Sequence, residues 1–160
     1  MGLHRVERLV RRRFLRLIPQ VRRYPVGDKL EPQEGAVSQL NDTIEFVRIA
    51  ADALDDKKGL DIALLDVGDL LSITEVFVIV TGNSRPHVKT LAESVDEKLK
   101  EHGRRPLRSE GASEGEWVLL DYGDFVVHVF QATPRDFYGL ERLWGDAPRI
   151  QWEPSVHSES

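Results

Sequence analysis

The 160-residue chain contains no cysteine, which excludes disulfides, thiolate zinc sites, iron–sulfur clusters and cysteine nucleophiles. It also has no uncharged apolar stretch near the roughly eighteen residues that a membrane-spanning helix needs, and its N-terminus lacks the apolar block of a secretory signal. Hydrophobic residues make up 41% and charged residues 31%, as in ordinary globular domains. We therefore expect one soluble, cytoplasmic folded domain.

Charge is spread unevenly along the chain, whose net charge is −5. Residues 1–25 hold eight arginines and one glutamate, a net charge of +7, whereas the remaining residues hold 14 basic and 26 acidic ones, a net charge of −12. An acidic surface binds phosphate backbones poorly, because each phosphate contact needs a cation. If the acidic body meets a nucleoprotein particle, we expect it to contact protein.

Residues 1–37 are predicted to be a basic, flexible N-terminal extension and linker. Apolar residues recur every three or four positions from Leu3 to Val21, the pattern of a basic amphipathic helix that Pro19 would interrupt. Such a helix could contact RNA or a membrane surface; a transit peptide is disfavoured because no Ser or Thr precedes Ser38. The favoured interpretation is an extension that contributes nothing to the fold.

Residues 38–152 are predicted to form the domain, followed by a disordered tail over 153–160. Helices are expected where capping residues precede an apolar stripe. The first begins at Asp42 and ends at Gly59, and the second follows the cap Ser84 and ends at Gly103. A third is opened by Pro134, with Phe137, Leu140, Leu143 and Trp144 on its inner side.

Strands are expected where short apolar runs are rich in β-branched and aromatic residues. The runs span 61–67, 75–81, 117–121 and 125–130, with a short strand near 106–108. The strands 117–121 and 125–130 should pair as a hairpin. The order of elements predicts an α/β fold in which helices pack on one mixed β-sheet.

The turn from Thr81 to Val88 invites a nucleotide hypothesis, because a Gly and a Ser precede a helix N-terminus. It lacks the spacing of a P-loop or of a dinucleotide site. The catalytic alternative that remains is a magnesium-dependent nucleotidyltransferase using Ser84, Asp121 and Asp124, against a plain helix cap at Ser84. The histidines show no zinc spacing, and His128, inside an apolar strand, is expected to be held by a neighbour's hydrogen bond.

Aromatic residues gather between positions 117 and 144, which hold seven of the chain's twelve. Such a cluster supplies either core or a protein-binding hot spot. For Trp117 and Leu119 the two interpretations are about equally compatible with the composition.

Four segments resemble the ribosomal silencing factor family, also called the Iojap family, over about residues 43–148. They are ADALDDKKGLDIALLDV (51–67), FVIVTGNSRPHVKTLAESVDEKL (77–99), EGEWVLLDYGDFVVHVF (114–130) and RDFYGLERLWGDAP (135–148). The chain departs from the family at Glu75 and Val76, where an aspartate and an aromatic residue are usual, and at His87, where glutamine is common.

The resemblance implies a nucleotidyltransferase-like topology without its activity, so no enzyme, cofactor or metal site is expected. It implies binding to the large ribosomal subunit through ribosomal protein fourteen, which blocks joining of the small subunit and lowers translation. The contact residues that it implies are Trp117, Leu119, Leu120, Asp121 and Tyr122. Their family-typical neighbours are Asp124, His128, Arg135, Phe137, Tyr138 and Trp144.

Three further expectations accompany this resemblance. The Arg-rich N-terminus could contact ribosomal RNA, and the protein could form a homodimer off the ribosome. An assembly factor that escorts large-subunit precursors is the alternative within the same setting.

Overall fold

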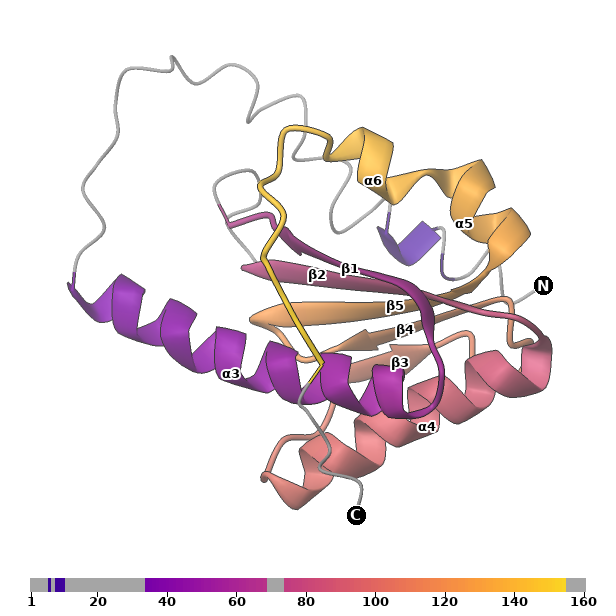
Figure 1. Cartoon of the computed structure of the whole chain (residues 1–160), viewed down its shortest axis with the longest axis horizontal. Helices are drawn as coiled ribbons and strands as arrows, with labels where there is room; N and C mark the ends of the chain where they lie inside the picture. Colours follow the sequence, from indigo (N-terminus) through magenta and orange to yellow (C-terminus); the bar gives the residue numbers. More distant parts are fainter. Residues whose placement is uncertain (1–5, 7, 11–33, 69–73, 155–160) are drawn as a thin grey trace.

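Three layers build the fold: a central β-sheet, two long helices on one face, and a layer of shorter segments on the other (Figure 1). The computed structural model describes residues 6, 8–10, 34–68 and 74–154. No helix within these ranges has the length and apolar character that crossing a bilayer requires.

The sheet has five strands in the order β1-β2-β5-β4-β3. β2 and β5 pair in parallel, and the other neighbours pair antiparallel, which confirms the predicted mixed sheet and the β4–β5 hairpin. Strands β2 and β4 are buried along their whole length, in keeping with the β-branched and aromatic residues of β2 and the largely apolar sequence of β4. The bounds are β1 Leu60–Asp66, β2 Val76–Gly82, β3 Arg108–Glu110, β4 Trp117–Asp121 and β5 Phe125–Gln131.

Helices α3 (Glu34–Asp56) and α4 (Arg85–Glu101) cover one face of the sheet (Figure 1). α4 begins as predicted, because the Ser84 hydroxyl accepts a hydrogen bond from the His87 amide at 3.1 Å. The predicted start of the first helix is wrong. α3 begins at Glu34, inside the stretch interpreted as a linker, so Asp42 lies within the helix and does not cap it.

Helices α5 (Ala132–Tyr138) and α6 (Leu140–Leu143) lie on the opposite face of the sheet (Figure 1). The sequence predicted one continuous helix here, but Gly139 adopts a left-handed conformation (φ 56°) that ends α5. The break changes which side chains face inward. Leu140 and Trp144 are buried, whereas Phe137 is 76% and Leu143 41% exposed, so the predicted inward orientation of these two is wrong.

The same face also carries a short N-terminal helical piece, drawn in indigo in Figure 1. Its side chains Val6, Leu9 and Val10 are at most 5% exposed and share a core cluster with Leu140 and Trp144. The expectation that the extension contributes nothing to the fold is therefore wrong for these residues. The rest of the predicted amphipathic helix, and residues 155–160 of the predicted tail, lie outside the described residues.

Candidate functional site

The five residues that the resemblance implicates in partner binding lie on β4 and in the turn that follows it. Each has at most 4% of its surface exposed. β4 lies between β5 and β3, and helices or helical segments cover both faces of the sheet at this point. In this structure the five side chains are therefore part of the core, and their contact with a partner stays a prediction. The residues are Trp117, Leu119, Leu120, Asp121 and Tyr122.

The side chains of β4 also divide between two faces of the sheet, because successive residues of a strand point in opposite directions. Trp117 and Leu119 belong to the core cluster on the α5–α6 side. Leu120 and Tyr122 belong to the cluster under α3 and α4, where Tyr122 stacks on Phe125 with ring centroids 4.7 Å apart. One partner surface cannot touch both pairs while the sheet is intact.

Trp117 is the centre of an aromatic cluster on the α5–α6 side. Its ring stacks on Phe130 at 4.6 Å and lies 4.8 Å from the ring of Tyr138, measured between centroids. Its indole Nε1 donates a hydrogen bond to His128 Nδ1 at 3.2 Å, which confirms the expected role of His128 as a residue held by a neighbour. Trp144 completes the cluster, with its ring 4.9 Å from that of Phe77.

The burial of His128 makes the stability of the fold depend on pH. Complete desolvation lowers the pKa of His128 from 6.5 to about 3. Between these two values the unfolded chain binds a proton that the folded chain does not, so the free energy of unfolding falls as the pH falls below 6.5.

We expect this residue alone to lower the free energy of unfolding by about 1.4 kcal/mol between pH 7.5 and pH 5.5. Urea unfolding at both pH values measures the change. His128→Gln should reduce the pH dependence by that amount. Equal pH dependence in the wild type and the His128 variant would contradict the assignment.

The residues of the nucleotidyltransferase alternative do not form a site. Gly82 at the end of β2 aligns with Gln131 at the end of β5, so Ser84 lies beyond this end of the sheet. Asp124 precedes the first residue of β5 and therefore lies at the opposite end, about 20 Å away along a seven-residue strand.

The side chains of these residues serve the fold. Asp124 forms an ion pair with Arg104 at 2.6 Å and accepts a hydrogen bond from Thr43 at 2.8 Å. Asp121 accepts one from the Gly123 amide at 2.9 Å within the hairpin turn. Within the part of the chain that the structure describes, no three acids and histidines are grouped so that they could hold a metal ion.

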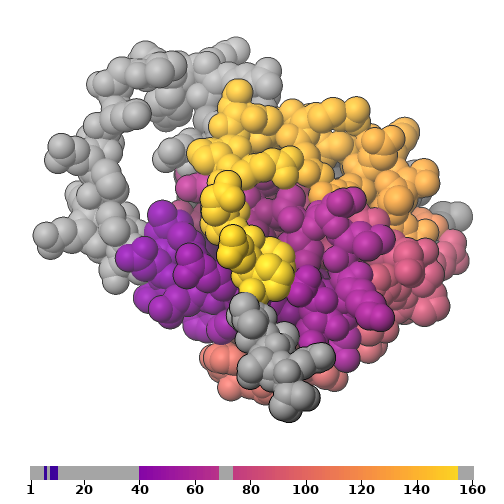
Figure 2. Space-filling model, viewed as in Figure 1, coloured from indigo at the N-terminus to yellow at the C-terminus, as the bar shows by residue number. Residues whose placement is uncertain are grey.

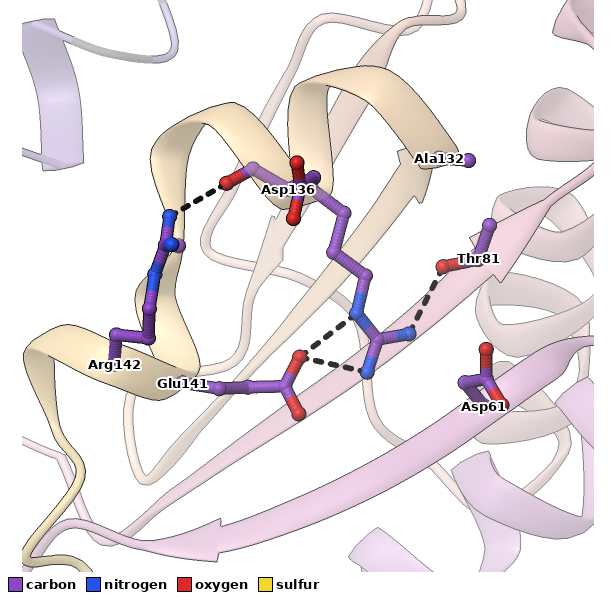
Figure 3. Close-up of a pocket in the computed structure, with 8 residues that line it drawn as sticks. Asp61, Thr81, Ala132, Asp136, Glu141 and Arg142 are labelled. Atoms are coloured by element: carbon purple, nitrogen blue, oxygen red, sulfur yellow. Dashed lines mark hydrogen bonds and ion pairs between the residues drawn. The ribbon is translucent and has the colours of Figure 1, made fainter.

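A polar pocket of about 370 Å³ lies between α5, α6 and the ends of β1 and β2 (Figure 3). The guanidinium of Arg135 lies between two elements there. It pairs with Glu141 at 2.8 Å and donates to the Thr81 hydroxyl at 2.9 Å. Because these contacts use all three of its nitrogens, we interpret Arg135 as a tether that fixes α5 and α6 to the sheet.

Two large apolar side chains of α5 and α6 are exposed, Phe137 and Leu143. The ring of Phe137 meets that of Tyr138 edge-on at 5.1 Å, and Tyr138 in turn covers Trp117. In the space-filling view the segment from α5 to α6, in orange to yellow, forms part of the outer surface (Figure 2). Its exposed apolar residues, Phe137 and Leu143, are here called the α5–α6 patch.

A family profile and two proteins with similar sequences agree on one protein family. The profile of the family described as ribosomal silencing factor during starvation matches residues 40–160. A ribosomal silencing factor of Chromobacterium violaceum is 48% identical over 101 residues, which are 63% of this chain and 83% of the relative. That of Bacillus subtilis is 43% identical over 103 residues, 64% of this chain and 87% of the relative.

Solved structures agree with these relatives. A crystal structure of a Chromobacterium violaceum protein superposes with a TM-score of 0.63 at 43% identity, covering 72% of this chain and 95% of that one. A crystal structure from Bacillus halodurans gives a TM-score of 0.61 at 35% identity, covering 68% and 98%. The described sheet and helices therefore belong to a known architecture.

Proposed function

Because the chain belongs to the ribosomal silencing factor family, we propose that it is a translational repressor that binds the large ribosomal subunit and blocks joining of the small subunit. The observation that carries this proposal is the match of the family profile to residues 40–160, which include every strand of the sheet. A ribosomal silencing factor of Chromobacterium violaceum, 48% identical over 101 residues, supports the proposal.

The charge of the chain supports a protein partner on the ribosome. Beyond residue 25 the chain has a net charge of −12, and such a body meets a basic protein more favourably than a phosphate backbone. The partner that the family resemblance implies is ribosomal protein fourteen of the large subunit. The eight arginines of residues 1–25 are the part of the chain suited to ribosomal RNA.

We place the docking surface on the α5–α6 side of the sheet. Phe137 and Leu143 are large exposed apolar residues of its two helices, and Trp117 and Leu119 belong to the core cluster on this side of the sheet. An exposed aromatic residue beside arginines and acids has the composition of a protein-binding hot spot. In this proposal Leu120 and Tyr122 support β4 from the other face and do not touch the partner.

The proposed mechanism is occupation of space, without catalytic turnover. The separation of Ser84 from Asp124 supports this mechanism, because it speaks against the catalytic arrangement that the sequence suggested. A rigid domain bound on the subunit-facing side of the large subunit blocks joining through its volume alone. The proposal places this activity in the cytoplasm, where ribosomal subunits meet.

Sedimentation of the purified protein with separated ribosomal subunits tests the proposal. We expect the protein to migrate with large subunits and not with small ones. Migration with neither subunit would contradict the proposal. Migration only with immature large-subunit particles would favour the assembly-factor alternative.

A further inference from the structure

We propose that Val6, Leu9 and Val10 form a cover over part of the docking face, and that the large subunit binds after this cover is displaced. These three residues are here called the N-terminal cover. The inference rests on the proposed function, since it names what regulates access to the proposed docking surface. It assigns a role to a segment that precedes the family domain.

The contacts of the cover place it on the α5–α6 side of the sheet. Val6 is 0%, Leu9 5% and Val10 1% exposed, and all three belong to the cluster that contains Trp117 and Leu119. Val6 lies against Gly111, at 2.9 Å from where a Cβ on that glycine would stand, beside the backbone of Trp117. The cover therefore lies at the start of the strand that the family resemblance implicates in binding.

The cover is an addition to the domain shared with the relatives. The family profile begins at residue 40, and the matched segments already span 83% and 87% of the relatives from Chromobacterium violaceum and Bacillus subtilis. The sheet and the helices of the domain therefore account for most of those relatives. A segment outside this shared domain that covers its apolar face is placed to control access to it.

The cover is suited to reversible displacement. Among the described residues of this segment, three aliphatic side chains on one short helical piece touch the face, and Arg8 between them is exposed. A tethered segment competes with any partner for the same apolar surface. The apparent affinity of the partner is then its intrinsic affinity multiplied by the fraction of molecules in which the face is free. A partner that binds this face more strongly than the cover does displaces it.

Weakening the cover should therefore strengthen binding to the large subunit. In the full chain, Val6→Asn together with Val10→Asn replaces two buried aliphatic groups by polar ones without changing the net charge. If the cover leaves the face free in about one wild-type molecule in ten, the apparent Kd is about tenfold higher than that of an uncovered protein. We therefore expect the Kd of the double variant for large subunits to be about tenfold lower than that of the wild type. The matched control Leu9→Met keeps the cover apolar and should leave Kd unchanged.

A single introduced thiol reports displacement directly, because the chain has no cysteine of its own. A thiol at Val10→Cys should react slowly with a small maleimide in the free protein and rapidly when large subunits are added. A thiol at the exposed Lys100→Cys, on α4, should react rapidly in both cases. Circular dichroism of each variant confirms that it is folded.

Each outcome decides the inference. Tighter binding by the Val6 and Val10 double variant, together with a thiol at position 10 that becomes reactive on binding, supports it. Binding with an unchanged or higher Kd, or with a thiol that stays protected, overturns the cover and leaves the proposed function standing. A thiol that is fully reactive in the free protein also overturns the cover. Failure of every variant and of the wild type to bind large subunits overturns the proposed function, and the inference with it.

Discussion

Replacing Trp117 by alanine is expected to lower the free energy of unfolding by about 3–5 kcal/mol, the usual cost of truncating a large buried aromatic residue. Trp117 is 2% exposed, stacks on Phe130 and donates a hydrogen bond to His128. The substitution leaves a cavity between the sheet and α5 and removes the hydrogen-bond partner of a buried imidazole nitrogen. Urea unfolding at pH 7.5 measures the loss.

Phe137→Ala is the matched control, because it truncates an aromatic residue of the neighbouring helix that is 76% exposed. It should change the free energy of unfolding by no more than about 0.5 kcal/mol. A Trp117→Ala protein as stable as the wild type would show that the indole is not buried in the core. The expected instability also means that loss of ribosome binding in this variant would report loss of the fold.

The second large effect is expected at the α5–α6 patch. Phe137→Ala together with Leu143→Ala should weaken binding to large subunits about thirtyfold or more, because truncation of a hot spot costs about 2 kcal/mol. Both side chains are exposed, so the free energy of unfolding should change little. Titration of labelled protein with large subunits, read by sedimentation or fluorescence anisotropy, measures the affinity.

Leu107→Ala is the control for this experiment. Leu107 is 75% exposed and lies beside Gly123, at the opposite end of the sheet from the start of α5. Its removal should leave the affinity unchanged. Equal binding by the patch variant and the wild type would contradict the proposed docking surface, and a loss in the Leu107 variant alone would move it to the β3 edge.

Much of the fold could be predicted from the sequence because local chemistry decides it. The residues of β2 and β5 are almost all β-branched or aromatic, and α4 has a serine cap at one end and a stripe of apolar residues. Helix α3 begins at Glu34, earlier than predicted. The prediction placed the start at Asp42 because aspartate is a common capping residue, and the sequence around it did not show that the helix continues on its N-terminal side.

The break at Gly139 was missed for a related reason. The apolar spacing from Phe137 to Trp144 fits one helix, whereas the left-handed conformation of Gly139 divides it and turns Phe137 and Leu143 outward. The glycine was the available signal, since glycine in the interior of a predicted helix often ends it.

The candidate site could be predicted only in part. Composition could not decide whether Trp117 lies in the core or in an interface, because both environments favour tryptophan. The decision depends on what covers both faces of β4, and this includes three residues more than 100 positions earlier in the chain, Val6, Leu9 and Val10. Their apolar spacing was visible in the sequence, but a contact over such a separation was not.

The most direct test of the central claim is a subunit-joining assay with large subunits that have been saturated with this protein beforehand. Small subunits are added at a magnesium concentration that supports joining, and the fraction of joined ribosomes is read from a sucrose gradient. We expect this fraction to fall as the wild-type protein is titrated in. The fraction should stay high when the variant with Phe137→Ala and Leu143→Ala is titrated in at the same concentrations. Joining that proceeds unchanged on large subunits shown to carry the protein would contradict the claim that it silences ribosomes by blocking the joining surface.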